Sequence, residues 1–264
     1  MSAYLLVATC ALLAAGLTLY SGFGLGTLLL PVFALFFPVE VAVLATAVVH
    51  GANNVFKVSM VGRYADRSTV LRFGLPALAA AVLGAMALGW FAARPPLFSY
   101  ELGPIAAEVR PIKLLMGLLM MVFACFELAP SLRRFRFHHD HLLWGGLLSG
   151  FFGGLSGHQG ALRSAFLVKS GLDTQAFVGT SSVIGLLVDL ARLLAYGALV
   201  LFAGQAALHI PGQAYGLVVT GCLAAFAGVL LGKRYLHKVK IDLVQTLTGV
   251  LLFALALLLL AGWI

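Results

Sequence analysis

The sequence predicts an all-α integral membrane protein built from two inverted repeats of about five helical elements each. Three observations lead to this prediction. Hydrophobic residues make up 62% of the 264 residues and charged residues only 10%, whereas a soluble domain carries roughly 25% charged residues. Apolar runs of about 20 residues, the length that crosses a ~30 Å hydrocarbon core, recur along the chain. Two glycine-rich breaks divide these runs into two similar sets.

Five apolar elements are expected in the N-terminal membrane repeat, which we place at residues 1–130. The chain starts without the positively charged segment of a signal peptide, so we expect the first run to remain in the protein. Helices are favoured throughout, because the alternating strands of about ten residues that form membrane barrels are absent. The expected elements are residues 3–19, 24–37, 39–57, 73–92 and 112–130.

The C-terminal membrane repeat, residues 142–264, follows a basic linker at residues 131–141. Each repeat opens on a glycine-rich first helix, broken at residues 20–26 and 153–160, because each helical glycine costs about 1 kcal/mol relative to alanine. Each broken helix is either a pair of short crossings or a re-entrant hairpin. The expected elements of this repeat are residues 142–156, 160–171, 174–200, 214–232 and 242–263.

The positive charges indicate how the repeats are oriented in the membrane. The chain has 17 Lys and Arg residues against 9 Asp and Glu residues, and the cations cluster between apolar runs, as in cytoplasmic loops rather than nucleic-acid surfaces. The clusters follow the third element, beginning at Lys57, and the fifth and ninth elements. Because these positions are all odd, the loops share the cytoplasmic side of the inner membrane, and the second repeat is inverted. The cytoplasmic loops are residues 58–72, 131–141 and 233–241.

The two glycine-rich breaks predict sites for anions. A helix that begins inside the membrane leaves backbone N–H groups unpaired and carries a partial positive charge at its start. Glycine also lets an anion approach the backbone closely. We therefore expect anion cradles around Gly24, Gly26 and Thr27 in the first repeat and around Gly160 in the second. The alternative is that these glycines serve only close helix packing.

Arg163, just after the second break, is the strongest single indication of an anion site. An arginine in lipid is costly, so it is expected to face protein or water, where two parallel N–H groups can hold an oxyanion. Alternatively, it pairs with Asp189 or extends to the nearer interface. Asp189 also has Arg192 three residues away as a partner. The break contributes further polar residues to the expected site: His158, Gln159 and Ser164.

Two long helices contribute more candidates for substrate binding. A shift of 134 residues aligns Thr46 with Thr180, as expected for an internal duplication. His50 is alternatively a neutral partner of another helix or a proton carrier, since its pKa is easily moved across neutrality. The hydroxyl groups alternatively bond their own helix backbone. The candidates are His50, Asn53 and Asn54 in the third element and Thr180, Ser181 and Ser182 in the eighth.

Metal, cofactor and disulfide sites are not expected. Cys10, Cys125 and Cys222 lie far apart within apolar runs, without the spacing of metal ligands or disulfides. The histidines within residues 138–141 lie in a charged loop and are expected to be solvated.

Both repeats share one order of motifs. Residues 22–31, Gly-Phe-Gly-Leu-Gly-Thr-Leu-Leu-Leu-Pro, precede Val-Ala-Val-Leu-Ala-Thr at residues 41–46, and the glycine-rich residues 153–160 precede Val-Gly-Thr-Ser-Ser at residues 178–182. These segments resemble the sulfite exporter TauE/SafE family of membrane permeases, and the resemblance covers essentially the whole chain. It implies transport of sulfite, organosulfonates or other small anions. The chain departs from the family pattern where Arg163 follows the second glycine-rich run.

The expected function is a secondary transporter that exports a small anion, such as sulfite, a sulfoacetate-like organosulfonate or a small carboxylate. Alternating access would take place around an anion site at the midplane of the membrane. No nucleotide-binding motif is present, so ATP does not drive transport directly. The inside-negative potential favours anion export by about 2.3 kcal/mol per charge at about 100 mV. Proton or sodium coupling and a homodimer are compatible with the sequence, and no nucleic acid partner is expected.

Two alternatives come from other functional classes. An anion channel would show flux that does not saturate. An intramembrane serine protease would use Ser156, which lies in the GxSG arrangement of rhomboid-like enzymes, and would need His50 as its base. The inverted duplication is unnecessary for proteolysis.

Overall fold

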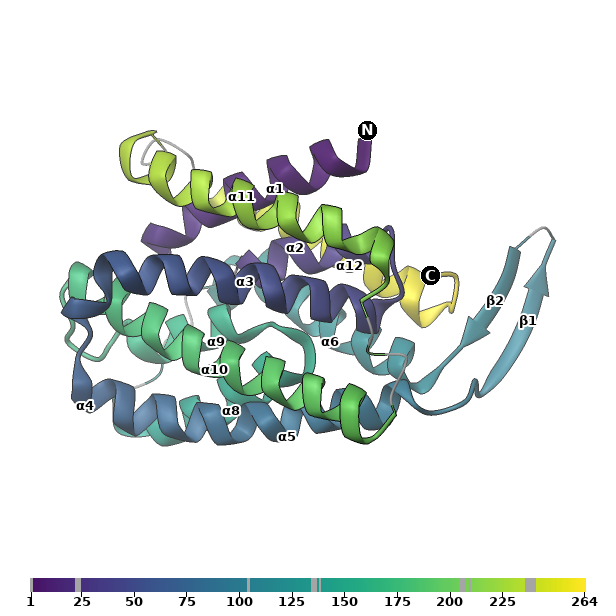
Figure 1. Cartoon of the computed structure of the whole chain (residues 1–264), viewed down its shortest axis with the longest axis horizontal. Helices are drawn as coiled ribbons and strands as arrows, with labels where there is room; N and C mark the ends of the chain where they lie inside the picture. Colours follow the sequence, from purple (N-terminus) through teal and green to yellow (C-terminus); the bar gives the residue numbers. More distant parts are fainter. Residues whose placement is uncertain are drawn as a thin grey trace.

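The computed structural model is built mostly from helices (Figure 1). It describes residues 2–21, 25–103, 105–133, 137, 139–204, 208, 210–235 and 241–264. Within these residues, every expected apolar element contains a helix. The helices are α1 (Ser2–Ser21), α2 (Leu25–Ala34), α3 (Val39–Val61), α5 (Leu75–Ala92), α6 (Pro111–Leu128), α8 (Leu142–Ser156), α9 (Gln159–Leu167), α10 (Thr174–Phe202), α11 (Gly212–Tyr235) and α12 (Ile241–Leu260).

Five helical stretches in the described part of the chain are long and apolar enough to cross a membrane. This agrees with the expected helical membrane protein. The stretches are Val39–Tyr64, Arg67–Ala92, Pro111–Leu128, Thr174–Phe202 and Gly212–Gly232. In contrast, α2 and α9 have only 10 and 9 residues, which makes each about 15 Å long at most, roughly half of a bilayer core.

The connections contain short helical turns. Between α3 and α5, Asp66 is the N-cap of the short helix α4 (Arg67–Thr69). Its side chain accepts a hydrogen bond of 2.7 Å from the N–H of Thr69, and the hydrogen bonds from Thr69 hold the pKa of Asp66 below its usual value. The turns are η1 (Gly62–Tyr64), α4 (Arg67–Thr69), the π-helical η2 (Val70–Gly74), α7 (Pro130–Arg133) and η3 (His139–His141).

The helices α8 and α9 form a helical hairpin. Gly157 between them has a left-handed backbone with a φ of 81°, which ends α8. The N–H of Phe137, before the start of α8, donates to the carbonyl of Ala165 near the end of α9 at 3.0 Å. The ring of Phe137 also stacks on that of Phe166, with 4.0 Å between centroids. The end of α9 thus returns to the start of α8, and the second break is a hairpin. The first break includes residues 22–24, which lie outside the described residues.

The helices of the two halves pack against each other in reciprocal pairs (Figure 1). The first helix of the N-terminal half, α1, packs on the fourth of the C-terminal half, α11. Reciprocally, α8 packs on α5. The remaining partners are equivalent helices: α2 contacts α9, α3 packs on α10, and α6 packs on α12. The halves therefore interlock, and α3 lies between α10 and α11.

Glycine permits close approach in both of the first-to-fourth pairs. A Cβ atom on Gly150 of α8 would lie 2.0 Å from the carbonyl oxygen of Ala77 in α5. A Cβ atom on Gly228 of α11 would lie 2.2 Å from the carbonyl oxygen of Leu12 in α1. In a membrane, where lipid competes for apolar surfaces, such close backbone contact supplies much of the attraction between helices.

A β-hairpin that the all-α expectation did not include projects from the helices (Figure 1). Its strands, β1 (Phe98–Leu102) and β2 (Ile105–Val109), are antiparallel. The hairpin is anchored near the C-terminus, because the N–H of Glu108 donates to the carbonyl of Gly262 and the hydroxyl of Tyr100 to that of Ala261. Five-residue strands are too short to resemble a membrane barrel, so the search for long alternating segments missed them.

Candidate functional site

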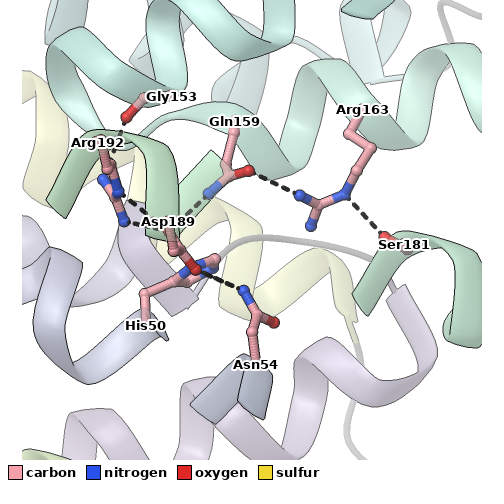
Figure 2. A network of polar contacts seen from close by, with 8 residues as sticks. All are labelled: His50, Asn54, Gly153, Gln159, Arg163, Ser181, Asp189 and Arg192. Atoms are coloured by element: carbon pink, nitrogen blue, oxygen red, sulfur yellow. Dashed lines mark hydrogen bonds and ion pairs between the residues drawn. The ribbon is translucent and has the colours of Figure 1, made fainter. Parts of the chain in front are cut away.

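The carboxylate of Asp189, in the middle of α10, is the centre of a buried polar network (Figure 2). Its side chain is fully buried. One oxygen, Oδ2, lies 2.6 Å from Nδ1 of His50 and accepts a 2.7 Å hydrogen bond from Asn54, both on α3. The other, Oδ1, accepts a 3.0 Å hydrogen bond from Nε2 of Gln159 at the start of α9. A single carboxylate therefore connects α3 of the first half with α9 and α10 of the second.

Arg192 neutralises Asp189 and also caps a helix. Its Nε and Nη2 atoms donate to Oδ1 of Asp189 at 3.0 and 2.7 Å. Its Nη1 atom donates to the carbonyl of Gly153 at 3.1 Å, and the hydroxyl of Tyr196, one turn later, donates to the carbonyl of Gly154. These carbonyls belong to the last turn of α8, and that of Gly153 also accepts a 3.0 Å hydrogen bond from the N–H of Gly157. All three guanidinium nitrogens of Arg192 are occupied, so this arginine is structural.

Arg163 on α9 is also buried, with 5% of its surface exposed, but its partners are neutral. Its Nε atom donates to Oγ of Ser181 at 2.8 Å, and its Nη1 atom donates to Oε1 of Gln159 at 2.9 Å (Figure 2). Among the described residues, no carboxylate forms an ion pair with it. The arginine that Asp189 neutralises is Arg192, while Gln159 lies between Asp189 and Arg163.

The two short helices begin close to each other. A Cβ atom on Gly26, at the start of α2, would lie 2.9 Å from the carbonyl oxygen of Gly157, in the break before α9. It would also lie 3.7 Å from Cγ2 of Thr46 on α3. The N-terminal ends of α2 and α9 thus meet beside α3, and both carry the partial positive charge of a helix start.

Several polar groups on α2, on α3 and in the break before α9 are buried without a hydrogen-bond partner in the described part of the chain. They are the hydroxyls of Thr27 and Thr46, both amide atoms of Asn53, and Nε2 of His158. The other ring nitrogen of His158 lies 3.0 Å from the hydroxyl of Ser156, and its ring stacks on Phe123. A buried polar group without a partner costs about 1–3 kcal/mol, so such a cluster indicates a place where a polar ligand or water binds.

The structure brings many of the predicted site residues together. The network contains His50, Asn54, Gln159, Arg163 and Ser181. Gly26, Thr27 and His158 lie at or next to the starts of α2 and α9, which meet. Asn53 is buried on α3. Gly160 and Ser164 are buried on α9 beside this network.

Other predicted residues have different surroundings. The hydroxyl of Thr180 accepts a 2.8 Å hydrogen bond from the N–H of Asp66, at the turn after α3. The hydroxyl of Ser182 donates to the carbonyl of Val178 in its own helix. Gly24 lies outside the described residues.

Sequence reasoning missed two features of this site. It treated Asp189 only as a charge partner, because nothing in a single sequence connects residues 50 and 189. It also placed Lys57 at the start of a cytoplasmic loop, whereas α3 continues to Val61 and Lys57 is buried. The spacing of Thr46, His50 and Lys57 at whole helical turns was a signal that could have placed Lys57 on the same face.

The structure does not join Ser156 to His50, the base that the serine protease alternative required. The hydroxyl of Ser156 donates to the carbonyl of Phe152 at 3.0 Å, and His50 contacts Asp189 and Asn54 instead of Ser156. In the described ranges, no group of three or more His, Cys, Asp or Glu residues is placed to hold a metal ion.

Comparison with known proteins gave one result. The family model described as sulfite exporter TauE/SafE matches residues 6–259. Neither the curated proteins nor the solved structures gave a match.

We predict different consequences for the two buried arginines. The change Arg192→Ala removes the permanent positive charge beside Asp189 and a donor to the carbonyl of Gly153, and breaking such a buried pair costs about 3–5 kcal/mol. Arg163→Ala removes a charge whose direct partners are the neutral Ser181 and Gln159, so it should lower stability much less. Melting temperatures of the purified proteins test this difference, and an Arg163→Ala protein that melts as low as Arg192→Ala would contradict these assignments.

Proposed function

The chain belongs to the sulfite exporter TauE/SafE family and is a membrane transporter, and we propose that it exports a small anion such as sulfite, an organosulfonate or a small carboxylate. The proposed site lies where α2 and α9 begin, between α3 and α10. Transport is secondary, with alternating access around this site.

The observation that carries the proposal is the buried guanidinium of Arg163. A cation in a low-dielectric interior is costly unless a negative charge accompanies it. Asp189 is neutralised by Arg192, and the direct partners of Arg163 are the neutral Ser181 and Gln159. An oxyanion beside the guanidinium of Arg163 would supply a negative charge through charge-assisted hydrogen bonds.

The groups around Arg163 suit an oxyanion as well. The starts of α2 and α9 favour negative charge, and the hydroxyl of Thr27 and the amide of Asn53 offer donors that have no other partner in the described residues. Sulfite, sulfonate and carboxylate groups all accept several hydrogen bonds from such donors. Ligand binding there would offset the desolvation of the buried polar groups.

Alternating access is supported by the way the two halves meet. Reciprocal helix pairing is the pattern that two related repeats produce, and broken helices at the repeat interface are a feature of such transporters. The polar connection between α3 and α10, from His50 to Asp189, crosses the interface. A movement of one half against the other would break and re-form the contacts between α3 and α10, while the anion stays near Arg163.

The proposed topology places the basic loops at residues 58–72, 131–141 and 233–241 in the cytoplasm, with the protein in the inner membrane. A shared side for the first two loops is supported by the packing of Phe73, just after the first, against Gly145 and Gly146, soon after the second. The inside-negative potential would then drive anions outward.

We predict that single cysteines at Ala65 and Leu236, in a background without Cys10, Cys125 and Cys222, react with an impermeant thiol reagent only from the cytoplasmic side. A cysteine at Ser99, in the exposed β-hairpin, should react only from the other side. Labelling intact cells and inverted vesicles measures both. Opposite sidedness for positions 65 and 236 would overturn the inverted topology.

We predict that Arg163 determines anion affinity. Arg163→Lys keeps the charge but loses the planar fork, so the affinity for sulfite should fall with little change in folding. Arg163→Ala should weaken binding more, by roughly 10- to 100-fold, the value of a hydrogen bond to a charged group. Stabilisation of the purified protein by added sulfite measures the affinity. Unchanged affinity in a folded Arg163→Ala protein would remove Arg163 from the site.

A further inference from the structure

A row of polar residues runs along one buried face of α3. Thr46, His50, Asn53 and Lys57 follow one another at spacings of four, three and four residues, which places them on one side of a helix. Each has at most 6% of its surface exposed. The row begins beside Gly26 and passes His50, the partner of Asp189. Lys57 is its last member.

The packing of α3 against α10 places Lys57 level with Arg163. A Cβ atom on Gly185 of α10 would lie 2.8 Å from Nδ2 of Asn54 and 3.2 Å from Nη1 of Arg163. Further along the same antiparallel pair, a Cβ atom on Gly179 would lie 2.6 Å from the carbonyl oxygen of Val61.

Between these two contacts, α10 presents Ser181, whose hydroxyl accepts from Nε of Arg163. On α3, Lys57 occupies the interval between Asn54 and Val61. Lys57 and Arg163, both buried, accordingly lie at the same level of the α3–α10 pair. One cation comes from each half of the chain.

Two neighbouring cations inside a protein distinguish ligands by charge. Coulomb attraction scales with the product of the charges and is stronger in the interior than in water. An anion with one charged group at Arg163 gains little by extending toward Lys57. An anion with a second negative charge gains the attraction of both cations and offsets the repulsion between them.

We propose that Lys57 is a second cationic ligand of the anion site and that it makes the site prefer doubly charged anions over singly charged ones. This inference rests on the proposed anion transport and specifies its substrate class. The preferred substrate carries two anionic groups on a short skeleton, with one at Arg163 and the other at Lys57. The neutral amide of Asn53, one turn before Lys57 on the same buried face of α3, has no hydrogen-bond partner among the described residues.

The test compares two sulfonates that differ in charge. Sulfoacetate carries a sulfonate and a carboxylate, and methanesulfonate carries the sulfonate alone. Their affinities are measured on the purified full-length protein, Lys57→Gln and the control Lys169→Gln, which removes an equal charge from an exposed position. Lys57→Met provides a second neutral variant if Lys57→Gln does not fold, and melting temperatures report folding.

We predict that the unmodified protein binds sulfoacetate more tightly than methanesulfonate. In Lys57→Gln, the sulfoacetate affinity should fall about tenfold or more, while methanesulfonate affinity changes much less. Lys169→Gln should keep the preference. An equal loss of affinity for both sulfonates in Lys57→Gln, or no loss, would overturn the role of Lys57 and leave the anion site intact. Failure of the unmodified protein to bind either sulfonate or sulfite would overturn the proposed function and this inference together.

Discussion

The structure depends on the burial of one carboxylate. Asp189 lies in the middle of a helix long and apolar enough to cross a membrane, where an isolated charge is very costly. Arg192 supplies the opposite charge, and His50, Asn54 and Gln159 supply hydrogen bonds. Because these partners come from α3, α9 and α10, satisfying the carboxylate fixes the positions of these three helices.

This arrangement separates the roles of two buried arginines. Arg192 has each guanidinium nitrogen bonded to Asp189 or to a carbonyl at the end of α8. The amide of Gln159 lies between Asp189 and Arg163: it donates a hydrogen bond to Asp189 and accepts one from Arg163. That amide orients the guanidinium without neutralising it. The protein thereby retains a positive charge in its interior. Hydrogen bonds from the surrounding helices hold this charge in place, where it can bind an anion away from water.

The sequence predicted the helices well, because a hydrocarbon solvent imposes long apolar runs and glycine marks the interruptions. It also predicted that Arg163 faces protein or water instead of lipid, because an arginine in lipid is costly, and the structure buries Arg163. It did not reveal the role of Asp189 as the centre of the network, because its partner His50 is 139 residues away and a single sequence does not show which helices touch. Lys57 was misplaced by an underestimate of the length of α3, and the β-hairpin was missed because each strand has only five residues.

The central claim is that the buried charge of Arg163 binds the transported anion. Sulfite efflux from proteoliposomes with an imposed inside-negative potential tests it most directly. The account predicts saturable efflux that the potential accelerates in the unmodified protein, and little efflux in Arg163→Ala although that protein remains folded. Equal rates in the two proteins, each with a normal melting temperature, would contradict the account.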